Sequence, residues 1–474
     1  MRKKIASCQT SREAVPAAWA VEELAGAKLP DKRLVQRAQI IMTQFGQQPS
    51  ASIPQACGQW PEIKAAYRFF DNEGVDPQQL LAPHSAATVR RMQRHPVVLA
   101  VQDTTSLNYS AHPRTRGLGP IGNKAHKPIG IFLHTSIAVS VEGEALGTLA
   151  AQTWAGDARR FGSSRDAQRR NGQPISEKES QRWLDSLTSC QQVAGQCPET
   201  VVVNVADREA DIYELFAQAL GGPKSVHLLV RSQHNRRVED PAGKLWPRLR
   251  QQPPAATLQV QTPRRTGRPS RTAALSIRFT EVSLRSPILK EGQPALRLWA
   301  IEAREEHPPK GHEPILWRLL TTLPVWSAAQ AVEKVRWYAK RWQIEVLHKV
   351  LKSGCQIEQR QLETAARLRR VLMLDLIVAW RVMQLNQAAR QRPDASAQEW
   401  LQTTEWTVLW CYFHRGQKPP ATAPTIRQAV RWIGHLGGFI GRKSDGEPGP
   451  IVLWRGLQRL HDLTETLSIL KNCG

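Results

Sequence analysis

The sequence contains few cysteines and none of the spacings by which cysteine and histidine bind zinc. Seven cysteines are scattered over 474 residues, and no C-x-x-C pair occurs among them. This odd, dispersed set disfavours a disulfide framework or a zinc ribbon, so we expect free thiols in a reducing cytoplasm. The thirteen histidines include no H-E-x-x-H spacing, so a zinc hydrolase is not indicated.

Long apolar stretches are also missing. The longest run, Val371 to Leu385, is interrupted by Asp375 and Arg381. It is too short and too charged to span a bilayer, and it predicts a buried core helix. The first ten residues, M-R-K-K-I-A-S-C-Q-T, lack the apolar segment of a signal peptide. We therefore expect a cytoplasmic protein that is not embedded in a membrane.

Acidic residues are the minority charge. The chain has 41 Asp and Glu against 65 Lys and Arg, a formal net charge of +24. A surface this basic attracts polyanions. Nucleic acid is the commonest such partner, and an anionic membrane surface is the second candidate. The chain length allows several domains and at least one sizeable core.

The residue patterns change in order along the chain from helical to mixed, then β-rich, then helical again. Two runs of apolar and β-branched residues, Val97 to Ser106 and Thr200 to Asp207, predict strands buried on both faces. Residues 238–325 alternate in polarity and contain several prolines, which predicts antiparallel strands. From Ser327 onward the pattern is mostly helical.

Both predicted buried strands end at an aspartate, Asp103 in the first and Asp207 in the second. Ligands often bind beyond the carboxyl ends of such strands. If the strands are neighbours, the two carboxylates meet and repel each other unless a cation or a proton intervenes. Mg²⁺ suits such a site. Either aspartate alone is more often a turn former or helix cap, so both interpretations stay open at this point.

The stretch from Trp337 to Gly354 predicts a helix with one acid among several cations. One stripe of this helix carries Tyr338, Arg341, Trp342, Glu345, Lys349 and Lys352. A salt-bridged surface would account for the charges but would rarely include the two aromatic residues. The stripe favours a site in which Glu345 binds a metal ion while the cations and the tyrosine hydroxyl bind phosphate oxygens.

The spacing Y-(2)-R-(3)-E-(6)-K, formed by Tyr338, Arg341, Glu345 and Lys352, resembles the DDE transposases of bacterial insertion sequences, in the insertion-sequence-four group. Further motifs of that family occur in order along the chain, most of them before this helix, and the resemblance spans nearly the whole chain. They are A-A-Y-R-F-F (Ala65 to Phe70), Q-D-T-T-S-L-N-Y (Gln102 to Tyr109), E-K-E-S-x-x-W (Glu177 to Trp183), D-R-E-A-D-I-Y (Asp207 to Tyr213) and L-G-G-F (Leu436 to Phe439).

The resemblance implies an α/β fold: a ribonuclease-H-like catalytic core with a β-strand insertion domain, a helical N-terminal DNA-binding domain and a helical C-terminal domain. We expect a transposon-end-binding domain at 1–75 and a core in two parts, 76–237 and 326–388. The β-rich insertion is expected at 238–325, and a dimerisation domain at 389–474.

The resemblance also implies the chemistry. Asp103, Asp207 and Glu345 would hold two metal ions, Mg²⁺ or alternatively Mn²⁺, for cleavage of double-stranded DNA at the transposon ends. Cleavage through a hairpin and strand transfer into target DNA, carried out by a homodimer in a synaptic complex on the bacterial nucleoid, would complete cut-and-paste transposition.

The expected DNA contacts follow from the same resemblance. Tyr338, Arg341, Lys349 and Lys352 would contact the DNA, Trp317 would stack on a flipped base, and Arg231 would bind the transposon end. A family lysine is replaced by Gln233, which suggests different end sequences.

Three alternatives stay open. The first is a metal-dependent endonuclease without strand transfer, and the second is a catalytically silent DNA-binding regulator. The third is a basic protein that binds membrane surfaces, although the family motifs have no role in lipid binding.

Overall fold

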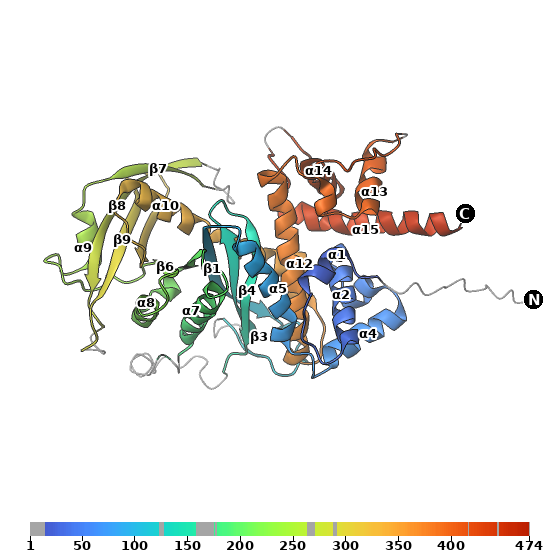
Figure 1. The fold of residues 1–474 in the computed structure, drawn as a ribbon, viewed down its shortest axis with the longest axis horizontal. Coiled ribbons are helices and arrows are strands. Elements are labelled where there is room, and N and C mark those ends of the chain that lie inside the picture. Colours follow the sequence, from blue (N-terminus) through green and yellow to red (C-terminus); the bar gives the residue numbers. More distant parts are fainter. Residues whose placement is uncertain are drawn as a thin grey trace, which may run out of the picture.

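The structure is a computed structural model that describes residues 15–122, 128–157, 175, 178–262, 271–287, 292–415, 417–442 and 445–473. One large sheet occupies the middle and left of Figure 1, and helix α12 stands between this sheet and two groups of terminal helices. None of the described helices is long and apolar enough to cross a membrane.

The N-terminal region is helical, and polar caps set where its helices begin. The side chain of Asp31 accepts a hydrogen bond from the backbone N–H of Arg33, Ser52 forms a capping box with Gln55, and Asp76 accepts from two backbone N–H groups. The helices are α1 (Ala18–Glu23), α2 (Lys32–Gln47), α3 (Ile53–Cys57), α4 (Trp60–Asp71) and α5 (Pro77–Met92).

The sheet has ten strands, and its central part has the strand order β4-β3-β1-β5-β6. The strands are β1 (Val97–Asn108), β2 (Gly119–Pro120), β3 (Ile129–Ser140), β4 (Ala145–Trp154), β5 (Val201–Ala206) and β6 (Val226–Arg231). β1 is antiparallel to β3 and parallel to β5, which is parallel to β6. Three antiparallel strands followed by two parallel ones make the ribonuclease-H-like core, which confirms the expected fold class.

The β-rich segment continues this sheet. Strand β10 (Leu316–Thr321) pairs antiparallel with β6, and the order then runs through β9 (Leu296–Glu305), β8 (Arg271–Leu284) and β7 (Ala256–Thr262). The short helix α9 (Leu245–Arg250) packs against β8 and β9. The segment therefore extends the edge of the core through backbone hydrogen bonds.

Alternate side chains of β1 pack into two different hydrophobic clusters, one on each face of the sheet. Val98 and Ala100 pack into a cluster with α7 (Gln181–Ala194) and α8 (Tyr213–Leu220). Leu99 and Val101 pack on the other side, in a cluster that includes side chains of α10 (Ala328–Ala339), α11 (Trp342–Lys349) and α12 (Ala365–Gln391). Because successive strand residues point to opposite faces, Asp103 shares the face of α10, α11 and α12.

The C-terminal helices form a third cluster around Leu409, Val430 and Ile433. They are α13 (Thr403–Phe413), α14 (Ile426–Leu436) and α15 (Pro450–Cys473), which projects from the body in Figure 1. Short turns complete the chain: η3 (Arg208–Ala210), η5 (Val350–Gly354), η6 (Ile357–Gln359) and η7 (Ala397–Glu399).

Helix α12 confirms the buried helix predicted around Val371 to Leu385, and a buried ion pair explains the acid inside it. Asp375 is fully buried and accepts hydrogen bonds at 2.9 and 3.1 Å from Arg360. The same guanidinium donates to the carbonyl of Ala51 at 2.7 Å. This contact ties the N-terminal helices to α12.

Removing one member of a buried pair leaves the other charge without compensation. We predict that Asp375→Ala lowers the free energy of unfolding by about 3–5 kcal/mol. The matched control is Glu399→Ala, which removes the partner of the exposed Arg392 and should cost less than about 1 kcal/mol. Urea unfolding followed by circular dichroism measures both. Equal losses in the two variants would contradict this account of the Arg360 pair.

Candidate active site

The first predicted acid, Asp103, lies inside its strand. We expected the strand to stop there, and this is wrong: β1 continues to Asn108, because β3 pairs with it as far as Gly130. The pairing with β5, in contrast, ends at Val101 opposite Val205. Asp103 therefore lies just beyond the end of β5, with a side chain that is 22% exposed. Its Oδ1 accepts a 2.7 Å hydrogen bond from the backbone N–H of Thr104.

The second acid, Asp207, follows β5 directly and caps the turn η3, where its Oδ1 accepts from the backbone N–H of Glu209 at 2.9 Å. The parallel register that pairs Val101 with Val205, continued by two residues, sets Asp103 beside Asp207. Burial and the negative charge of Asp207 raise the pKa of Asp103 to about 6. Burial also raises the pKa of Asp207.

The third acid, Glu345, reaches this pair through an arginine. The guanidinium of Arg341 contacts Asp103 Oδ2 at 3.1 Å with one nitrogen and pairs with Glu345 through the other. The negative charge of Glu345 also contributes to the raised pKa of Asp103. The Glu345 side chain is 58% exposed and that of Arg341 is 18% exposed. One cation thus lies among the three predicted carboxylates.

The stripe that carries Glu345 is not one continuous α-helix, which corrects the expectation. Helix α10 ends at Ala339, α11 begins at Trp342, and a π-turn follows α11 at Val350–Gly354. The backbone N–H groups of Lys340 and Arg341 bond to carbonyls three residues back, and this tightens the chain. Tyr338 is buried, whereas Trp342 is exposed.

Three further predicted residues gather beside the acids. The ring of Tyr338 meets that of Trp317 edge-on, with centroids 5.6 Å apart. Arg231 donates to the carbonyl of Leu316 at 2.9 Å. Burial raises the pKa of Tyr338 although the charges of Arg341 and Arg231 lower it. The Tyr338 hydroxyl is therefore within reach of two guanidinium groups.

The two lysines of the stripe are placed differently. Lys352, in the π-turn, points to Glu358, with its Nζ 4.0 Å from Oε1. Glu358 also accepts a hydrogen bond from the backbone N–H of Asn108, at the end of β1. Lys349 is exposed at the end of α11. Both lysines border the site without contacting the three acids.

Comparison with known families gives three matches in chain order. Residues 16–75 match the description "Transposase DNA-binding", residues 151–381 match "Transposase DDE domain", and residues 377–471 match "Transposase Tn5 dimerisation domain". The chain belongs to the DDE transposases. It therefore has a transposase DNA-binding domain, a catalytic DDE domain and a dimerisation domain.

Among solved structures, the cryo-EM structure of a piggyBac transposase synaptic complex with hairpin DNA is similar to this transposase. The similarity covers 76% of this chain and 67% of that one, with 10% identity and a TM-score of 0.35.

The DDE-domain match includes Asp207 and Glu345, whereas Asp103 precedes its first residue. Asp103 is linked to the other two acids by β-sheet register and by Arg341. DDE domains depend on divalent metal ions, and carboxylate oxygens are the ligands that hard cations such as Mg²⁺ prefer. Within the described ranges, however, no group of three or more acidic, histidine or cysteine side chains is placed closely enough to hold a metal ion. The Arg341 guanidinium supplies the positive charge there instead.

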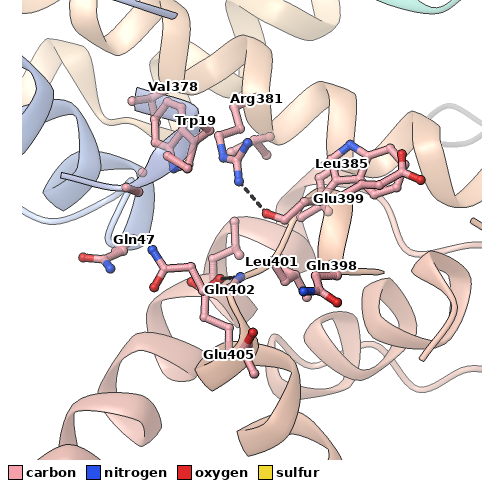
Figure 2. A pocket seen from close by; sticks show the side chains of 17 residues that line it. Trp19, Gln47, Val378, Arg381, Leu385, Gln398, Glu399, Leu401, Gln402 and Glu405 are labelled. Carbon is pink, nitrogen blue, oxygen red and sulfur yellow. Dashed lines mark hydrogen bonds between the residues drawn. The ribbon is translucent and has the colours of Figure 1, made fainter. Parts of the chain in front are cut away.

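A cavity of ≈390 Å³ lies away from the acids, where the DNA-binding match meets the dimerisation match (Figure 2). Arg381 of α12 stacks over Trp19 of α1 at 4.4 Å and donates to the carbonyl of Trp400 at 2.5 Å. None of the predicted site residues lines this cavity. It lies where the N-terminal helices, α12 and the C-terminal region meet, and it is separate from the acid site.

Sequence reasoning missed a second set of polar residues on the opposite face of the same strands. Gln102 and Thr104 flank Asp103, and both contact His134 of β3. The signal was the presence of polar residues within apolar strands, including Asn204 of β5. Glu177 of the quoted E-K-E-S-x-x-W motif lies outside the described residues.

The raised pKa of Asp103 makes the stability of the folded protein decrease as pH rises. The folded protein binds this proton more tightly than the unfolded chain, so the cost of ionising Asp103 grows as pH rises from about 4 through 6. We predict that Asp103→Asn raises the melting temperature of the metal-free transposase at pH 8. Differential scanning fluorimetry across pH 5 to 8 measures the gain, which should shrink toward pH 5. A gain that grows as pH falls would contradict this sign.

Proposed function

We propose that this transposase carries out cut-and-paste DNA transposition with Asp103, Asp207 and Glu345 as its catalytic acids. The observation that carries the proposal is that Asp103 and Glu345 both pair with the guanidinium of Arg341, while strand register sets Asp207 beside Asp103. They come from two neighbouring strands and a helix that packs against β1. Once Glu345 turns from Arg341 toward the two aspartates, the three carboxylates would suit divalent cations bound to a phosphate.

In this proposal the three carboxylates are the metal ligands, and Mg²⁺ is the expected ion, with Mn²⁺ as a substitute. When bound, the ions lower the pKa of the attacking water or 3′-hydroxyl and stabilise the departing oxygen. Asp103 must lose its proton to ligate, which its pKa of about 6 allows at neutral pH. Glu345, exposed and on a helix, turns from Arg341 toward the aspartates, and this frees Arg341 for a phosphate oxygen.

The remaining site residues contact DNA in this proposal. Tyr338 and Arg231 flank Arg341 and form a patch of hydrogen-bond donors next to the acids. Lys349 and Lys352 extend this patch along α11 and the π-turn. Lys352 exchanges Glu358 for a phosphate, because their 4.0 Å contact is weak. The spacing of Tyr338, Arg341, Glu345 and Lys352 supports membership of the Y-R-E-K group.

The other segments complete the proposed cycle. Residues 1–75 bind the inverted ends of the transposon, and residues 389–474 pair two copies in a synaptic complex. The core comprises 76–237 and 326–388, with 238–325 as the insertion. Cleavage passes through a hairpin on the transposon DNA, and strand transfer into target DNA follows. The place of action is the bacterial nucleoid.

A nuclease that cuts without joining is the second candidate, since the same three acids serve both reactions. A strand-transfer assay with pre-cut transposon ends separates the two functions. Joining of the ends to a target plasmid supports the transposase, whereas cleavage without joining supports the nuclease. Metal-independent end binding with neither reaction supports a regulator.

The role of Glu345 can be tested with an isosteric change. We predict that Glu345→Gln reduces Mg²⁺-dependent cleavage of a plasmid carrying the gene and its flanks by at least about a hundredfold, because the neutral amide lacks the negative charge of the carboxylates by which Mg²⁺ is bound. End binding in a gel-shift assay should be unchanged. Glu333→Gln, at another half-exposed glutamate of the neighbouring helix α10, is the matched control. Retained cleavage in Glu345→Gln would remove this residue from the metal site.

The role of Trp317 can be tested by separating two steps. If a flipped base stacks on its indole, Trp317→Ala should slow hairpin formation more than the first nick, since stacking contributes about 1–3 kcal/mol per base. Trp299→Ala, which removes a neighbouring sheet tryptophan that packs on Trp326, is the control. Denaturing gels resolve nicked and hairpin products over time. An equal slowing of both steps would indicate damage to the packing around Tyr338.

A further inference from the structure

A continuous chain of side-chain hydrogen bonds runs behind the catalytic strands, on the face opposite the three acids. Arg182 of α7 donates through Nε to Thr104 Oγ1 at 3.0 Å, and Thr104 Oγ1 contacts His134 Nδ1 at 2.9 Å. His134 Nε2 contacts Gln102 Oε1 at 3.0 Å. The chain then passes from Gln102 to Asn204, and from there to Cys190 at 3.4 Å.

The direction of these hydrogen bonds follows from the donors. Gln102 Oε1 can only accept, so His134 carries its proton on Nε2 and accepts at Nδ1 from the Thr104 hydroxyl. The Thr104 oxygen in turn accepts from Arg182. Burial lowers the pKa of His134 to about 3, so the ring is neutral. Each donor therefore points away from Arg182, which fixes the Thr104 hydroxyl in one orientation.

Arg182 reaches both catalytic aspartates through one intermediate residue each. Toward Asp103 the intermediate is Thr104, whose backbone N–H donates to the carboxylate. Toward Asp207 it is Glu209, which pairs with Arg182 Nη2 at 2.6 Å and whose backbone N–H donates to that carboxylate at 2.9 Å.

The Arg182 guanidinium is itself held in place. Its Nη1 donates to the carbonyl of Glu179 at 2.8 Å, and its side chain is only 14% exposed. The planar guanidinium provides fixed donor directions for all three partners, which a single ammonium group does not.

We propose that Arg182 is a positioning residue that sets the distance between the Asp103 and Asp207 carboxylates from the back of the sheet. The inference rests on the proposed function of the two aspartates as metal ligands. Without Arg182, the Thr104 hydroxyl and the Glu209 loop lose their common anchor. The two carboxylates then move independently, and metal binding has to bring them together.

The test measures metal binding to the DNA-free protein, so it does not depend on catalysis. Free Mn²⁺ is titrated against wild type and Arg182→Met and quantified by electron paramagnetic resonance. We expect the Kd for Mn²⁺ to rise about tenfold in the variant, the effect expected when a residue that orients a metal ligand is lost. Metal-free binding to transposon-end DNA should be unchanged.

Two further variants keep the result interpretable. Arg91→Met removes a comparably buried arginine, 18% exposed and paired with Glu23 far from the acids, and should destabilise the fold while leaving the Kd for Mn²⁺ within twofold. Thr104→Val removes the hydroxyl that Arg182 contacts but keeps the backbone N–H that holds Asp103. Thr104→Val should weaken Mn²⁺ binding to a similar extent, and it provides the test of the proposal if Arg182→Met does not fold.

The contradicting outcomes are distinct. Wild-type Mn²⁺ affinity in folded Arg182→Met and Thr104→Val would show that the chain of hydrogen bonds is only structural. Weaker end binding with unchanged Mn²⁺ affinity would make Arg182 a DNA contact and overturn the proposal. If Asp103→Asn and Asp207→Asn also left Mn²⁺ binding unchanged, the proposed metal site itself would fail.

Discussion

Two carboxylates held side by side beyond the ends of neighbouring strands require a positive charge between them, and this requirement organises the site. The parallel register of β1 and β5 sets Asp103 next to Asp207 in a half-buried position. Burial raises the pKa values of both aspartates, and the negative charge of Asp207 adds to the shift at Asp103. Because the sheet determines the spacing of the two acids, the fold creates a position at which a cation is stabilised.

In the structure that cation is the guanidinium of Arg341, which pairs with Asp103 and Glu345 together. The residue stands at the turn between α10 and α11, so its position depends on the break between these helices. A divalent ion and Arg341 would compete for the same oxygens. We infer that metal binding and the release of Arg341 toward a phosphate are one coupled event. The break between α10 and α11 therefore places Arg341 next to the acids.

The positions of several residues of this candidate site could be predicted from the sequence, because the relevant signals are local. Apolar runs that end in Asp103 and Asp207 indicate the strands, and the spacing from Tyr338 to Lys352 indicates the helical segment. The contact of Lys352 with Glu358 and the burial of Tyr338 could not be predicted, since both depend on how the turns at Lys340 and Val350 redirect the chain. The hydrogen bonds of Arg182 join residues 27 and 78 positions apart. Such contacts follow from strand register and helix packing, which no local pattern contains.

The most direct measurement is a crystal structure of the transposase grown with Mn²⁺, with anomalous scattering recorded at the manganese edge. We predict a peak bounded by oxygens of Asp103, Asp207 and Glu345, with the Arg341 guanidinium displaced from Asp103. A peak at another position, or Arg341 still paired with both acids in metal-loaded crystals, would contradict the claim that arginine and metal share one site.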